Sequence, residues 1–258
     1  WFLLFAMCAF CVLSTLSRAG LALFSLNCMI IFFISMLLKD REQKAVRKRK
    51  WIILIIMPLV ASAALYKAAD SIIERFTSAP EESKITRIVL AQAAMKMANE
   101  NIFGVGLNNF AHKINDPYPY GSDIPIEISP NPYRRGLVET AYMMIAAETG
   151  WLNLGIFFCM LLYFYIKNIL NLFRLKNSSL RYIAVALTGA LTQIYLQTTL
   201  EWVIKQTNNF YQLMLILAII SVMTKISKRA LQKSGNHIND DQLDAKSNLR
   251  RANCVTTI

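Results

Sequence analysis

The sequence predicts an all-α integral membrane protein with about six transmembrane helices and one large external loop that carries amphipathic helices. Hydrophobic residues make up 55% of the chain, and the mean hydropathy is +0.38. Apolar runs close to the roughly 20 residues needed to cross a bilayer recur along the chain. Residues 70–136 are too charged and too rich in proline to cross, and a long irregular loop is usually functional. The predicted spans are residues 1–16, 19–38, 51–69, 151–169, 180–200 and 208–226.

The N-terminal end of the sequence is expected to be incomplete. The chain begins at Trp1 rather than at a methionine, and its first apolar run, residues 1–16, is slightly short of a full span. We therefore expect the chain to be the C-terminal portion of a longer protein. The alternative is that it was processed, or is numbered, from an internal point.

Basic residues lie beside the apolar runs rather than on one binding face. The formal charge of +12 is compatible with nucleic-acid binding, but this placement is the usual signal of cytoplasmic loops, so no nucleic-acid partner is expected. Residues 39–50 carry seven basic side chains and are expected to be cytoplasmic, which by parity places the large loop outside. The predicted organisation is three spans in residues 1–69, the external loop in 70–150, three spans in 151–227, and a disordered cytoplasmic tail in 228–258.

The external loop is predicted to contain helices at both ends. Ser78 and Glu81 resemble a capping box, and a helix is expected from there to Phe103, ended by Gly104 and Gly106. Proline-rich, irregular sequence follows, and a second helix is expected from residue 137 into the next span. The first helix should be amphipathic. Its predicted polar stripe is Gln92, Lys96 and Asn99, and its predicted apolar stripe is Ile88, Ala91, Met95, Ala98 and Ile102.

Arg18 and Arg87 are the basic residues that we expect to bind a phosphate. Arg18 ends the first apolar run on the side where positive charge is depleted, and a planar guanidinium suits phosphate recognition. Arg87 aligns with small apolar residues on the predicted loop helix, which permits close approach of a ligand. The alternatives are an Arg18 that only reaches toward lipid headgroups and an Arg87 that belongs to a solvated face.

Glu139 is the candidate general base. It lies on the predicted helix 137–149, close to where apolar sequence resumes, and carboxylates at membrane depth are functional candidates. The alternative is that Glu139 pairs with Arg134 or Arg135 and holds the loop. Glu148, further along the same helix, is expected to cap or brace the junction with the next span.

Four other loop residues are candidates for binding the substrate: Lys84, His112, Arg134 and Arg135. The two arginines have interfacial anchoring as their alternative, and an isolated loop histidine is often incidental. Gln193, Gln197 and Glu201 are spaced four apart on one helix face, which indicates either a polar cavity or interhelical contacts. The sequence has no phosphate-binding glycine loop, metal-ligand cluster or serine nucleophile motif, so no cofactor and no metal are expected.

Three segments resemble the O-antigen ligase and polymerase family of bacterial membrane glycosyltransferases. They are "STLSRAGLALFSL", "TRIVLAQAAMKMANENIFGVGLNNF" and "VETAYMMIAAETGWLNLGIFF". They are similar to the family's arginine-bearing span end, its arginine helix with a following Gly-x-Gly, and its re-entry helix with Ala-Glu-x-Gly. Each motif is degenerate, but their order around one large external loop is fairly specific.

The resemblance implies a metal-independent enzyme of the bacterial inner membrane, with its active site on the periplasmic face. Arg18 and Arg87 match arginines thought to hold the diphosphate of an undecaprenyl-linked glycan. The acceptor would be a hydroxyl on a lipid A core or another glycan. Many members have His-Asn where this chain has Glu139 and Thr140, which leaves the acceptor type open. A polymerase of the same family, a non-enzymatic export or flippase component, and a structural assembly protein remain alternatives.

Overall fold

The computed structural model describes residues 2–15, 17–37, 81–125, 131, 136–175, 178–229 and 232. These residues form helices and connecting turns without any strand, which confirms the all-α prediction. Three of the described helices are long and apolar enough to cross a membrane: Ala19–Met36, Ala141–Arg174 and Thr207–Arg229. The expected count of six spans is not confirmed, and the predicted span 51–69 lies outside the described residues.

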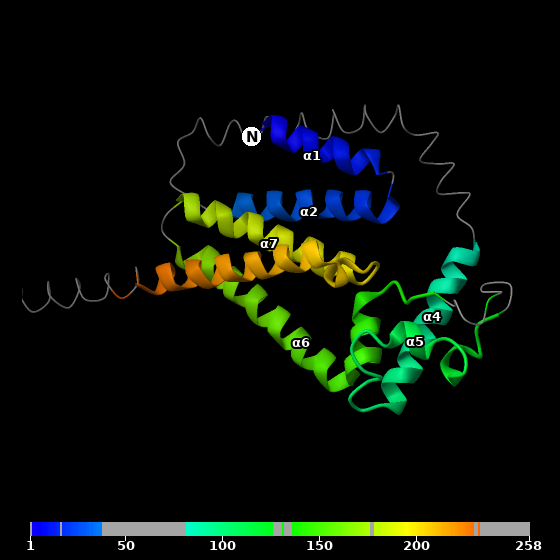
Figure 1. Ribbon diagram of the computed structural model, residues 1–258. Coiled ribbons are helices and arrows are strands. Elements are labelled where there is room, and N and C mark those ends of the chain that lie inside the picture. The colour runs from blue at the N-terminus through cyan, green and yellow to red at the C-terminus, as the bar shows by residue number, and fades with distance from the viewer. Residues whose placement is uncertain are drawn as a thin grey trace, which may run out of the picture.

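The first two helices form an antiparallel pair (Figure 1). α1 (Phe2–Ser14) has 13 residues, about 20 Å of helix, and is therefore shorter than the roughly 30 Å hydrocarbon core. α2 (Arg18–Leu37) begins where the Ser17 hydroxyl accepts the N–H of Gly20 at 3.1 Å, which is an N-cap contact. α2 packs along α7 (Ser178–Thr198), where a side chain at Gly189 would overlap α2. The glycine thus permits the close approach that membrane helices use.

Two buried asparagines of α6 (Ala141–Arg174) join it to its neighbours. Asn168 Nδ2 donates to the α7 carbonyl of Ala184 at 2.9 Å and to Thr188 Oγ1 at 2.8 Å. Asn171 Nδ2 donates to Thr224 Oγ1, on the helix Thr207–Arg229, at 3.1 Å. Because both asparagine amides are bonded across helices, they act as interhelical contacts rather than as the lining of a transport path.

The outer faces of these helices expose large apolar side chains. Exposing such faces to water costs free energy, whereas contact with lipid does not, which agrees with a membrane protein. The exposed residues on α1, α2, α6 and the helix Thr207–Arg229 include Leu3, Met7, Phe10, Phe33, Leu162, Leu215 and Val222.

The described part of the external loop packs on the first turns of α6. It consists of α4 (Glu81–Glu100), α5 (Phe110–Lys113) and the short 3-10 helix η1 (Pro119–Gly121), which lie together beside the bundle (Figure 1). Most of the predicted apolar stripe does not pack on the bundle, because Ile88, Met95 and Ile102 are exposed. Its member Ala98 is buried, together with small residues that let a neighbouring stripe approach α6. The buried α4 residues are Leu90, Ala93, Ala94, Met97 and Ala98.

α6 bends at Gly150, which has φ 84° and ψ 165°. The bend leaves the carbonyls of Ala147 and Glu148 without their helical partners. The loop after α4 replaces them: the N–H of Val105 donates to Ala147 at 2.8 Å, and the N–H of Gly106 donates to Glu148 at 2.9 Å. A side chain at Gly104 would overlap the Glu148 backbone in this contact. The Gly-x-Gly segment therefore docks on the α6 bend as well as following α4.

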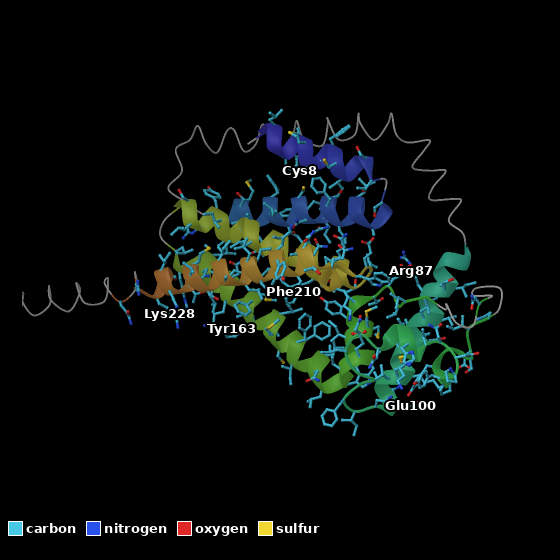
Figure 2. All side chains as sticks on the ribbon, in the orientation of Figure 1. Cys8, Arg87, Glu100, Tyr163, Phe210 and Lys228 are labelled. Atoms are coloured by element: carbon cyan, nitrogen blue, oxygen red, sulfur yellow. The ribbon has the colours of Figure 1, made fainter. Side chains whose placement is uncertain are left out.

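The helix ends sort into two sets along the bundle (Figure 1). The C-terminal ends of α2, α6 and the helix Thr207–Arg229 lie at the same end as the N-terminus of α7. Arg174 ends α6, Arg181 lies in the first turn of α7, and Lys228 lies at the same end of the bundle (Figure 2). The turn between α1 and α2 lies at the opposite end, which is also the end where α4 and α5 are found.

Candidate functional site

Arg87 and Glu139 form an ion pair between α4 and the segment that leads into α6. Arg87 Nε lies 2.5 Å from Glu139 Oε2, and the two side chains are about half and two-fifths exposed (51% and 39%). Glu139 was expected on a helix, but α6 begins after the N-cap residue Thr140, so Glu139 lies in a bend just before the helix. It was also expected, if structural, to pair with Arg134 or Arg135, which lie outside the described residues. Its described partner is Arg87.

The ion pair forms one wall of a pocket with a cavity volume of about 320 Å³. The turn after α7 supplies the opposite wall. The lining residues are Arg87, Glu139, Glu201, Trp202 and Gln206. One guanidinium and two carboxylates thus converge on one pocket, together with an indole and an amide. Such a set can bind an anion through Arg87 and accept a proton at a carboxylate.

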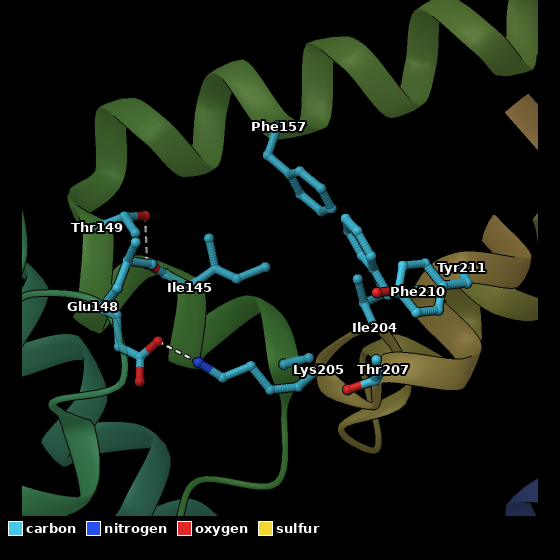
Figure 3. Close-up of a pocket in the computed structure, with 11 residues that line it drawn as sticks. Ile145, Glu148, Thr149, Phe157, Ile204, Lys205, Thr207, Phe210 and Tyr211 are labelled. Carbon is cyan, nitrogen blue, oxygen red and sulfur yellow. Dashed lines mark hydrogen bonds and ion pairs between the residues drawn. The ribbon is translucent and has the colours of Figure 1, made fainter. Parts of the chain in front are cut away.

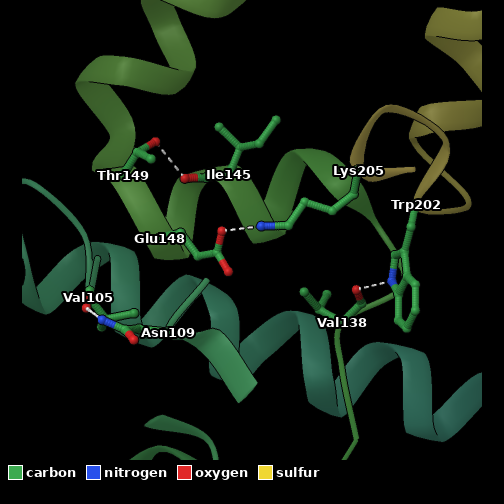
Figure 4. Close-up of polar contacts among 8 residues, drawn as sticks. All are labelled: Val105, Asn109, Val138, Ile145, Glu148, Thr149, Trp202 and Lys205. Carbon is green, nitrogen blue, oxygen red and sulfur yellow. Dashed lines mark hydrogen bonds and ion pairs between the residues drawn. The ribbon is translucent and has the colours of Figure 1, made fainter. Parts of the chain in front are cut away.

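Two contacts fix the turn after α7 against the start of α6 (Figure 4). The indole N–H of Trp202 donates to the carbonyl of Val138 at 2.5 Å. Lys205, in the 3-10 helix η2 (Val203–Lys205), forms a short ion pair with the buried carboxylate of Glu148. Glu148 braces the junction, as expected, through both its side chain and its carbonyl. These contacts hold Trp202 and its neighbours next to Glu139.

An apolar cavity of about 380 Å³ lies beside the Lys205–Glu148 pair (Figure 3). Aromatic side chains of α6 and of the helix Thr207–Arg229 face it: Phe157, Phe210 and Tyr211. Glu148 and Lys205 supply the charged groups of its wall and, because they are paired, they neutralise each other. This cavity is therefore suited to an apolar ligand rather than to an anion.

The Gln193–Gln197–Glu201 stripe forms a hydrogen-bonded ladder that runs from α7 into the turn after it. Gln193 Nε2 donates to Gln197 Oε1 at 3.5 Å, and Gln197 Nε2 donates to Glu201 Oε2 at 3.4 Å. Both bonds run along α7 and into the turn that follows it, rather than to another helix. Of the two expected roles, a polar cavity therefore fits better than interhelical contact, and the ladder ends at the pocket that holds Arg87.

The structure places the remaining predicted residues as follows. Arg18 is the first residue of α2, and Lys84 lies in the first turn of α4; their side chains, like residues 134 and 135, are outside the described part. The His112 ring packs edge-on against Tyr118 with centroids 5.1 Å apart, and it does not line the Arg87 pocket. Among the residues that the structure describes, no group of three His, Cys, Asp or Glu side chains could hold a metal ion.

Trp202 and Lys205 are site residues that the sequence analysis missed. A signal existed for each. Lys205 is a cation at the end of the bundle where α4 and α5 lie, where the sequence rules predict few cations, and Trp202 is an amphipathic aromatic at a span end. The partner of each residue, however, lies on another segment, and so the contacts required the fold.

The family described as O-antigen ligase matches residues 3–158, more than half of the chain. That range includes the Arg87–Glu139 pair and the α6 bend. No curated protein and no solved structure matches the chain. Family membership and apolar helices together indicate a membrane protein with glycosyltransferase-like function, and the chain belongs to the O-antigen ligase family.

Proposed function

We propose that this protein transfers a glycan from an undecaprenyl-diphosphate carrier to an acceptor hydroxyl at the outer face of the bacterial inner membrane. The single observation that supports this most is the pocket where Arg87 and Glu139 meet. It combines a group that binds phosphate with a group that accepts a proton. A lipid A core or another glycan supplies the hydroxyl.

The transfer is a substitution at the anomeric carbon of the donor sugar. The acceptor oxygen forms the new bond to that carbon while the bond to the carrier diphosphate breaks, and the electron pair leaves with the diphosphate. The hydroxyl proton passes to Glu139. Arg87, with Arg18 as its expected partner, stabilises the negative charge that grows on the departing diphosphate. No metal is assigned to any of these steps.

Because of this ion pair, the donor must bind to Arg87 before Glu139 can accept a proton. An incoming diphosphate competes with Glu139 for the Arg87 guanidinium because both ligands are anions. When the diphosphate takes Arg87, the Glu139 carboxylate loses its partner and becomes free to accept the acceptor's proton. Donor binding therefore exposes the base, and a site without donor keeps it occupied.

Transfer by the purified full-length protein in proteoliposomes tests this function. The donor is the lipid-linked glycan extracted from the host, and the acceptors are lipid A core and a second copy of the glycan. Arg87→Ala and Arg18→Ala should each abolish most transfer, and Arg→Lys at either position should restore little, because lysine lacks the bidentate fork. Lys96→Ala is the matched control, since Lys96 is on the same helix and pairs with exposed Asp123 at 3.5 Å.

The identity of the acceptor distinguishes a ligase from a polymerase. Capping of lipid A core identifies a ligase, and lengthening of the glycan identifies a polymerase. Full transfer by the Arg18→Ala, Arg87→Ala double variant at normal protein level would remove the phosphate-clamp mechanism. Movement of the donor across the bilayer without transfer would instead favour the flippase alternative.

A further inference from the structure

A second pocket adjoins the one that contains Arg87. It has a cavity volume of about 320 Å³ and lies between the end of α7 and the start of the helix Thr207–Arg229. Glu201 and Gln206 line both pockets, so the two pockets share a wall. The residues that line the second pocket are Ile194, Gln197, Glu201, Val203, Gln206, Asn209 and Gln212.

The chemistry of this lining differs from that of the first pocket. Four of its seven residues carry amides, one is a carboxylate and none is basic. Amides both donate and accept hydrogen bonds, as hydroxyl groups do, whereas a phosphate requires donors and favours cations. The lining therefore matches a neutral ligand with many hydroxyl groups, and it is unsuited to a second anion.

Three of the four amides, those of Gln197, Gln206 and Asn209, have a hydrogen-bond partner within this lining. Asn209 Nδ2 donates to Gln206 Oε1 at 2.6 Å, and Gln197 Nε2 donates to Glu201 at 3.4 Å. The asparagines of α6 form a contrast, because their hydrogen bonds join α6 to other helices. In the second pocket the bonds join residues three or four positions apart, and they orient the polar groups that line it. Preorganised polar groups reduce the entropy lost when a ligand binds.

We infer that this amide-lined pocket is a subsite for the sugar residues of the donor glycan. The inference rests on the proposed function, which places the donor's diphosphate at Arg87. The first sugar is bonded directly to that diphosphate, so the glycan must leave the Arg87 pocket by an adjoining recess. The second pocket offers hydroxyl-matching groups on such a path, with Gln206 at the boundary and Gln212 further along it.

Binding of the free oligosaccharide tests the subsite without the diphosphate. The probe is the oligosaccharide that mild acid releases from the host's lipid-linked glycan, titrated into the full-length protein in detergent by calorimetry. Gln212→Leu and Asn209→Leu should each raise its Kd about five- to tenfold, the usual effect of one lost hydrogen bond. Gln92→Leu, at an exposed position on α4 outside both pockets, is the matched control and should leave the Kd unchanged.

Two further variants separate the subsite from the proposed function and from misfolding. Arg87→Ala should leave the Kd of the free oligosaccharide unchanged, because the probe has no phosphate, while it abolishes transfer. Gln212→Glu keeps size and polarity but removes the amide donors, so it should weaken binding with an unchanged melting temperature. An unchanged Kd in Gln212→Leu and Asn209→Leu, or no binding to the wild-type protein, would overturn the subsite. Unchanged transfer by Arg87→Ala would instead count against the proposed function.

Discussion

Arg87 Nε and Glu139 Oε2 lie 2.5 Å apart, which joins the helix of the external loop to the segment that enters α6. Half-exposed ion pairs of this kind are worth little as stabilising contacts, roughly 0–1 kcal/mol. The pair is therefore better understood through what each partner can do when released. A guanidinium can take a phosphate, and a carboxylate can take a proton.

Glu139→Gln should have opposite effects on binding and on transfer. Removing the carboxylate frees Arg87, so the donor should bind up to about fivefold more tightly, the equivalent of roughly 1 kcal/mol for the lost competition. Loss of a general base should slow transfer about a hundredfold or more. Equilibrium binding of the lipid-linked donor and single-turnover transfer measure the two effects separately. Weaker donor binding with a normal transfer rate, together with a lowered melting temperature, would assign Glu139 a structural role instead.

The sequence indicated both members of this pair but not their contact. Motif resemblance and outer placement singled out Arg87 and Glu139 as chemistry-bearing residues. Their pairing depends on how α4 packs against α6, and local patterns could not decide that. Leu90 and Met97 lie on one apolar stripe of α4, and Ile88 and Met95 lie on another. Periodicity favoured the second, while the small residues beside Leu90 made the first the packing face.

Gly104→Ala and Gly150→Ala should each destabilise the protein strongly. Both glycines have positive φ, 73° and 84°, and a Cβ at either would overlap the backbone of the other segment. Strain and lost contacts should together exceed about 3 kcal/mol, and the melting temperature in detergent should fall by several degrees or more. Gly155→Ala is the matched control, because the space around this α6 glycine is open. There alanine should be neutral or stabilising by about 0.5–1 kcal/mol. Equal melting temperatures for Gly104→Ala and Gly155→Ala would contradict the docking of the glycine loop on the α6 bend.

Asn168→Ala should loosen α6 from α7 without changing the site. The Asn168 amide donates to both Ala184 and Thr188 at full burial, and its loss should cost about 1 kcal/mol, as buried interhelical bonds in membranes do. Thermal unfolding in detergent measures this loss, and donor affinity should stay within twofold of the wild type. Exposed Asn153, whose amide bonds back to Thr149 within α6 at 2.8 Å, is the control for an asparagine that joins no helices. A large change in donor affinity would show that Asn168 does more than hold helices together.

The organisation into helices was more accessible to sequence analysis than the site was. Hydropathy located the apolar helices, and Gly104 and Gly106 were expected to follow the helix that ends as α4. The junction expected near Glu148 is the bend of α6 at Gly150. The sequence did not show why the helices end or bend at these places. The N–H groups after Gly104 bond carbonyls at the α6 bend, and a contact between distant segments leaves no local pattern. Lys205 was missed for the same reason, because its partner Glu148 lies on another helix.

The Lys205–Glu148 pair should respond asymmetrically to the loss of each partner. The Glu148 side chain is 4% exposed and the Lys205 side chain 35% exposed, so only the lysine can turn its charge to solvent. Lys205→Met strands a buried carboxylate and should cost about 2–3 kcal/mol, whereas Glu148→Gln should cost about 1 kcal/mol. The double variant should recover much of the Lys205→Met loss, because no buried charge remains. Melting temperatures of the four proteins in detergent measure this cycle, with Asp123→Asn at the exposed Lys96 pair as the control for a surface contact. A larger loss for Glu148→Gln than for Lys205→Met would mean that the lysine, rather than the carboxylate, is the group that depends on the pairing.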